Sequence, residues 1–186
     1  MKSLETIQKV SKFAKILSKI VFVFCTIGLI LIIIGAIGVS MIDLNALIDS
    51  KILSIVDLPD YNFSKAAVYD ALMIGAIGLI CEMFVAKKSI NYFKFELEEG
   101  TPFTEESADK IKKLGITVIV APIIATIISI IGHVLIEKLI GNVGEIDVNY
   151  EISLTMGLIY LFLSAVFRYG ASLSKKETKK SKKTEK

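Results

Sequence analysis

The sequence predicts an all-α fold: a four-helix transmembrane bundle with both chain ends in the cytoplasm. Three observations predict it. Hydrophobic residues make up 53% of the 186 positions, they are gathered into four long runs, and most lysines lie outside those runs. A run of about 20 apolar residues spans a hydrocarbon core of about 30 Å. We therefore expect spans at about 20–41, 66–86, 116–136 and 152–173.

Residues 1–19 are expected to form a basic amphipathic helix. On a helical wheel one side carries Leu4, Ile7, Val10, Phe13, Ala14 and Leu17, and the other carries Lys2, Lys9, Lys12, Lys15 and Lys19. Such a helix lies at an anionic cytoplasmic surface and leads here into the first span. The span at 20–41 has no charged residue and exceeds the apolar stretch of a cleaved signal peptide, about 7 to 15 residues.

The second span follows an acidic outer loop at 42–65, which has room for a short helix around 44–55. Two acids, Asp70 and Glu82, are the only charges within the span. Its helix is expected to continue beyond the membrane until glycine and proline end it near residue 100.

A cytoplasmic helical hairpin is therefore expected between the second and third spans. Thr104 is placed to cap its second helix, and Glu105 and Glu106 follow in the first turn, where the helix dipole favours acids. The third span then contains Pro122, which can bend it, and His133 near its outer end.

The last part of the chain is predicted as an outer loop at 137–151, a fourth span at 152–173 and a disordered basic cytoplasmic tail at 174–186. Arg168 can extend its charge to the interface near the end of this span. Of the 22 lysines and arginines, 19 lie in the N-terminal segment, the hairpin with its flanking pair, and the stretch from residue 168 onward. Because basic residues stay on the cytoplasmic side, both termini are predicted to be inside.

The letters I-G-A-I-G occur twice, at 34–38 and at 74–78. Internal duplication is one reading. The favoured reading is that Gly35, Gly38, Gly75 and Gly78 mark surfaces where helices approach closely in lipid.

Ionisable residues within spans are the default functional candidates, here Asp70, Glu82 and His133. Asp70 and His133 are expected at a similar shallow depth and can pair near the outer surface. The pair is either a satisfied interfacial hydrogen bond or a proton sensor. Glu82 lies near Lys87 and Lys88, where a local ion pair or hydration would satisfy it.

No enzyme motif is present, and we expect neither a catalytic residue, nor a metal site, nor a cofactor. The chain has a single histidine, and its two cysteines, Cys25 and Cys81, lie in separate apolar runs and read as small hydrophobes. The lysine-rich tail has no interleaved aromatics. It indicates attraction to anionic lipid head groups, and direct nucleic-acid binding is not expected.

Two stretches resemble a known family. The letters E-G-T-P-F-T at 99–104, followed by K-L-G at 113–115, resemble the G-x-P-F-T and later L-G signature of the bacterial domain of unknown function 2975 family, and F-R-Y-G at 167–170 is similar to its F-x-Y-G element. These motif residues are Gly100, Pro102, Phe103, Thr104, Phe167, Arg168, Tyr169 and Gly170. Where the family commonly has an acidic stretch after the second motif, this chain is lysine-rich.

The resemblance implies a small multi-pass protein of the bacterial cytoplasmic membrane, often encoded beside a short helix-turn-helix regulator. A membrane-tethered regulatory or stress-response role, with residues 100–113 as the docking surface, is the hypothesis that follows. An immunity or self-protection protein, a small-solute or ion-handling protein, and a structural subunit of a membrane complex are the alternatives. Assembly into a homo-oligomer is left open.

Overall fold

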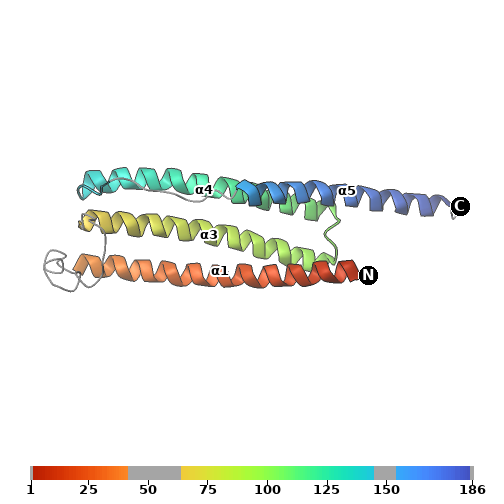
Figure 1. Ribbon diagram of the computed structural model, residues 1–186, viewed down its shortest axis with the longest axis horizontal. Helices are drawn as coiled ribbons and strands as arrows, with labels where there is room; N and C mark the ends of the chain where they lie inside the picture. Colours follow the sequence, from red (N-terminus) through yellow and green to blue (C-terminus); the bar gives the residue numbers. More distant parts are fainter. Residues whose placement is uncertain (1, 42–63, 145–153, 185–186) are drawn as a thin grey trace. The chain divides into compact units, whose positions relative to one another are not determined.

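The computed structural model describes residues 2–41, 64–144 and 154–184. These residues form four helices and no strand: α1 (Lys2–Met41), α3 (Lys65–Glu99), α4 (Glu105–Leu139) and α5 (Leu154–Thr184) (Figure 1). Each helix is long and apolar enough to cross a membrane by length and composition. The predicted all-α four-helix fold is confirmed, with the helices of a multi-pass membrane protein.

Large apolar side chains lie on the outside of the helices. Phe24, Leu31 and Phe162 are 68%, 62% and 70% exposed. In water, apolar surface on this scale would mark a binding site or an aggregation hazard. Around membrane-spanning helices it faces lipid chains, which are as apolar as the side chains themselves.

The helix ends at the hairpin follow the sequence signals. Gly100 ends α3 with a φ of 74°, a backbone conformation that glycine adopts without strain. The Thr104 hydroxyl then accepts a 3.0 Å hydrogen bond from the backbone N–H of Ser107, as a helix cap should. The hairpin therefore consists of α3, the five residues 100–104, here called the hairpin loop, and α4.

The helices extend further than the sequence predicts. Helix α1 has no break at residue 19, α4 continues through Pro122 to Leu139, and α5 continues to Thr184. The expected disordered tail is thus wrong for residues 174–184, which are helical. Adding a residue to an existing helix forms one hydrogen bond per residue ordered, and lysine and glutamate are good helix formers. The predicted short helix at 44–55 lies outside the described residues, as do most of the first predicted outer loop and residues 145–151 of the second.

The chain divides into two compact units. Unit 1 comprises 1–23, 83–121 and 152–186, and unit 2 comprises 24–82 and 122–151. The ranges of unit 1 contain 19 of the 22 basic residues. The segments that the lysine count assigns to the cytoplasm therefore belong to one unit.

Unit 1 has a small hydrophobic core between α3 and α4. Tyr92, Ile111 and Leu114 are its buried members, at 3%, 2% and 2% exposure, and Tyr160 and Leu163 of α5 pack against them. This core joins three helices of the unit.

In unit 2, glycines bring α1 close to α3. A Cβ atom added at Gly75 would lie 3.3 Å from the Ile32 side chain, and one added at Gly35 would lie 3.7 Å from Leu72. Gly38, by contrast, has no atom of the described residues within 4 Å of such an atom. The interpretation of the repeated letters as close packing therefore holds for Gly75 and fails for Gly38, while at Gly35 an added Cβ atom would make only an ordinary van der Waals contact.

Candidate functional site

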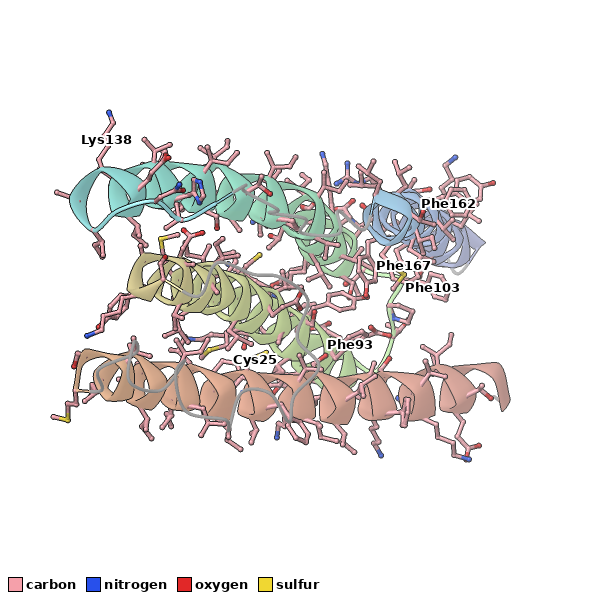
Figure 2. The ribbon with its side chains drawn as sticks, turned by 60° about the vertical axis from the view of Figure 1, so that its left-hand side comes forward. Cys25, Phe93, Phe103, Lys138, Phe162 and Phe167 are labelled. Carbon is pink, nitrogen blue, oxygen red and sulfur yellow. The ribbon has the colours of Figure 1, made fainter. Side chains whose placement is uncertain are left out.

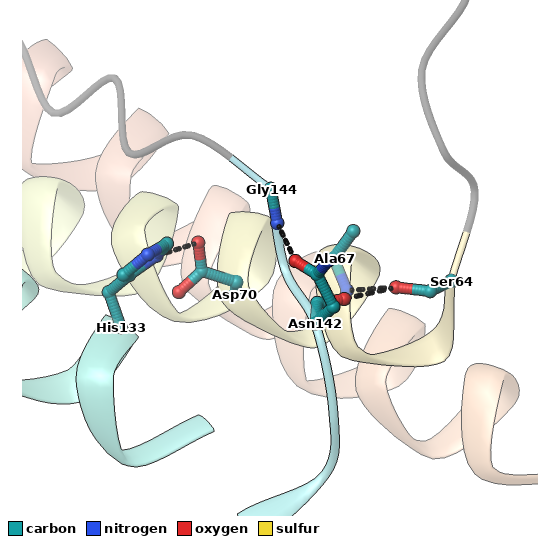
Figure 3. A network of polar contacts seen from close by, with 6 residues as sticks. All are labelled: Ser64, Ala67, Asp70, His133, Asn142 and Gly144. Atoms are coloured by element: carbon teal, nitrogen blue, oxygen red, sulfur yellow. Dashed lines mark hydrogen bonds and ion pairs between the residues drawn. The ribbon is translucent and has the colours of Figure 1, made fainter. Parts of the chain in front are cut away.

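A buried carboxylate and imidazole meet in unit 2. The Nδ1 atom of His133 on α4 lies 2.9 Å from Oδ2 of Asp70 on α3, and both residues are buried (Figure 3). The pairing that the sequence suggested is present. The second oxygen of Asp70, Oδ1, is also buried and has no hydrogen-bond partner within the described residues.

A second set of hydrogen bonds lies beside this pair. Ser64 accepts a 3.0 Å hydrogen bond from the backbone N–H of Ala67 and so caps α3, and its hydroxyl donates to the carbonyl of Asn142 at 3.1 Å. The Asn142 side chain in turn accepts from the N–H of Gly144 at 2.9 Å (Figure 3). These contacts tie the start of α3 to the segment after α4. Sequence reasoning missed them, although a serine before an apolar run is a recognisable cap signal.

Glu82 does not join the Asp70–His133 pair. It lies twelve residues further along α3, a distance of about 18 Å at helical rise, and it is exposed. It forms no ion pair within the described ranges, and of the two neighbouring lysines Lys88 lies over the Phe84 ring at 5.3 Å. No group of three or more metal-ligating side chains occurs among the described residues.

The motif residues assemble in unit 1, around the hairpin loop. On the α1 side, the Gln8 side-chain amide donates to the carbonyl of Gly100 at 3.2 Å. One turn along, the hydroxyl of Ser11 donates to the carboxylate of Glu96 at 2.8 Å. Ser11 and Glu96 are 3% and 6% exposed, so this is a buried hydrogen bond to an acid. Such a bond is among the stronger polar contacts because one partner is ionisable.

On the α5 side, Phe103 of the hairpin loop packs edge-on against Phe167, with ring centroids 5.7 Å apart (Figure 2). Its ring also covers Gly170. A Cβ atom at that position would lie 2.6 Å from Cδ1 of Phe103, closer than real carbon contacts. Glycine at 170 is therefore what lets the ring lie against the α5 backbone. The two motifs, far apart in sequence, form one contact.

Polar links continue this contact along α4 and α5. The Ser164 hydroxyl donates to the carbonyl of Ala108 at 2.8 Å, and both residues are buried. Arg168 forms an exposed ion pair with Asp109. Pro102 is fully buried, whereas Tyr169 is 66% exposed and takes no part in the contact with Phe103.

Sequence reasoning did not find the partners that hold the loop. Ser11, Glu96, Ser164 and Asp109 each meet a residue at least 56 positions away. Their contacts depend on which helix faces pack together. A serine or glutamate on an exposed turn gives the same sequence pattern, so no local signal could separate them.

Comparison with known proteins adds no relative. No family model, no curated protein and no solved structure matches this chain. The resemblance to the family of unknown function 2975 stays a prediction from the residues quoted above.

Proposed function

We propose that this protein is a membrane-tethered regulatory or stress-response protein of the bacterial cytoplasmic membrane, which acts through its hairpin loop. The observation that carries the proposal is the fixation of that loop from two sides, by Gln8 of α1 and by Phe167 and Gly170 of α5. A loop that only connects two spans needs no such contacts. A loop held in one conformation offers a partner a preformed surface, which lowers the entropic cost of binding.

The charge beside the loop indicates the kind of partner. Glu98 and Glu99 end α3, Glu105 and Glu106 begin α4, and all four are exposed. Three of them pair with a lysine, and Glu99 forms no ion pair within the described part of the chain. Complementary charge steers association. A small helix-turn-helix regulator, whose DNA-contacting surface is basic, fits this acidic rim.

The test is cross-linking in cells with the full chain. A photoreactive residue at Glu106, beside the hairpin loop, should capture a partner of small mass, and the same residue at the exposed Ile131 of unit 2 should not. The captured protein is identified by mass spectrometry. Glu99→Lys should weaken capture, while Glu137→Lys, on the other end of α4, should leave it unchanged.

Two outcomes would contradict the proposal. Equal capture from Glu106 and Ile131 would mean that the loop has no preferred partner. Deletion of the gene without any change in transcripts, but with altered sensitivity to ions or membrane-active peptides, would favour a transport or protection role.

The Asp70–His133 pair supports a second candidate, ion or proton handling on the predicted outer side. Oδ1 of Asp70 is a buried carboxylate oxygen with no hydrogen-bond partner among the described residues, and such oxygens are uncommon in folded proteins. If ions are the ligand, a gene carrying Asp70→Asn should fail to complement the ion-dependent phenotype of the deletion strain. A gene carrying Glu82→Gln should complement it fully.

A further inference from the structure

We propose that the recess between α4 and α5 in unit 1 binds the head group of an anionic phospholipid, with the first part of an acyl chain along its apolar end. The recess has a volume of about 520 Å³. Its apolar lining is Leu161 and Ala165, and its polar lining comprises Lys112, Arg168, Tyr169, Ser172 and Ser164, whose hydroxyl already donates to the carbonyl of Ala108. The proposed lipid site does not depend on the partner proposed for the hairpin loop, although Lys112 lies within the predicted docking surface at 100–113.

The lining is arranged along the axis of α5. Leu161, Ala165, Arg168 and Ser172 are spaced at three or four residues, so they share one face of the helix. From Leu161 to Ser172, about 16 Å of helix, the face changes from apolar to charged and hydroxyl-bearing. The charged end is the end nearer the predicted cytoplasm. A phospholipid has the same polarity gradient, whereas a free soluble anion would need only the charged end.

The charge of the recess favours an anion. Lys112 forms no ion pair with any residue in 2–41, 64–144 or 154–184. Arg168 uses one guanidinium nitrogen on Asp109, which leaves further N–H donors of its planar group for a phosphate. Basic recesses between spans on the cytoplasmic side are where anionic head groups bind. The exposed ring of Tyr169 suits the same interfacial depth.

The neighbouring lysine provides a matched control. Lys112 and Lys113 are both exposed on α4, and only Lys112 lines the recess. If the protein retains anionic lipid through general electrostatic attraction, retention should depend equally on both lysines. If it binds the lipid in the recess, retention should depend on Lys112 and not on Lys113.

The experiment uses the purified full chain in a neutral detergent, titrated with phosphatidylglycerol or with phosphatidylcholine of the same acyl chains and measured by native mass spectrometry. The wild type should retain phosphatidylglycerol preferentially. Lys112→Gln should weaken that retention about fivefold, the effect expected for one lysine beside an anionic head group. Lys113→Gln should change it by less than about twofold, and Lys112→Arg should restore it.

Two further measurements distinguish a phospholipid from a free soluble anion as the ligand of the recess. Ala165→Leu, which fills the apolar end, should reduce retention of phosphatidylglycerol, and glycerophosphoglycerol, the head group without acyl chains, should not compete. Competition by that free head group would show a soluble-anion site and overturn the lipid assignment. The lipid assignment would also be overturned if the two glutamine variants had equal effects or if both lipids were retained equally. A dimer mass that is lost in Lys112→Gln would overturn it as well.

Discussion

Gly115→Ala should loosen the packing of α4 against α5. A Cβ atom at Gly115 would lie 3.0 Å from the carbonyl oxygen of Gly157, 3.0 Å from Cβ of Tyr160 and 3.3 Å from the backbone N of Leu161. Two of these atoms belong to the α5 backbone and cannot rotate away. The helices must therefore separate by a few tenths of an ångström, and the extra methyl group cannot be absorbed by one side chain.

The magnitude follows from two opposing effects. Overpacking typically costs about 1–3 kcal/mol, and replacing glycine by alanine within a helix returns about 1 kcal/mol. Gly38→Ala, where nothing lies within 4 Å, should show only the gain. The two variants should thus differ by about 1–3 kcal/mol in the free energy of unfolding, or about 2–12 °C in Tm for a chain of this size.

A thiol-reactive fluorescent dye can follow thermal unfolding in detergent. The chain has no tryptophan, but Cys25 is buried and Cys81 partly buried, and both are free thiols. Heating should therefore expose reactive groups at the unfolding transition. A Tm for Gly115→Ala equal to or above that of Gly38→Ala would refute the inferred backbone contact.

Three further predictions use the same assay. Ser11→Ala should destabilise the protein by about 1–3 kcal/mol because it leaves the buried carboxylate of Glu96 without its hydrogen-bond donor. Ser18→Ala, which loses only a hydrogen bond within α1, should cost under about 1 kcal/mol. Equal costs would contradict a stabilising role for the hydrogen bond between α1 and α3. Asp70→Leu and His133→Leu should each lower the Tm, because each leaves the other buried polar side chain unpaired. The double variant should have a Tm close to that of the wild type, since neither polar side chain then remains. Additive losses of stability would contradict the pairing. Phe103→Ala should lower the Tm and also increase proteolysis within the hairpin loop, and unchanged cleavage would argue against its contact with α5.

The helix count and the hairpin ends were predictable because their causes are local. Apolar runs of lipid length with few charged residues indicate spans whatever surrounds them. Gly100 and Thr104 end and begin helices through their own backbone and side-chain chemistry. The tail was not predictable in this way, because a lysine-rich sequence such as that after Ser174 can be disordered alone and helical when it extends an existing helix.

The face of α1 that packs against other helices could not be predicted from the sequence. Its sequence has an obvious apolar side, yet Val10 and Phe13 on that side are 60% and 68% exposed, and Ser11 is the buried contact. In water the largest apolar residues would be the buried ones. In lipid there is no such drive, and small or hydrogen-bonding residues form the helix contacts instead. A helical wheel read by the rules for soluble proteins therefore does not identify the packed side of α1.

The hairpin loop has a consequence for the order in which the molecule is assembled. Gln8 is synthesised before the loop, but Phe167 and Gly170 belong to α5, which is synthesised after it. Until α5 leaves the ribosome, Phe103 has no ring to pack against and the loop is fastened only to α1. The loop reaches its final conformation only after α5 has been made, so a partner that recognises that conformation distinguishes chains that contain a folded α5 from nascent chains that still lack it.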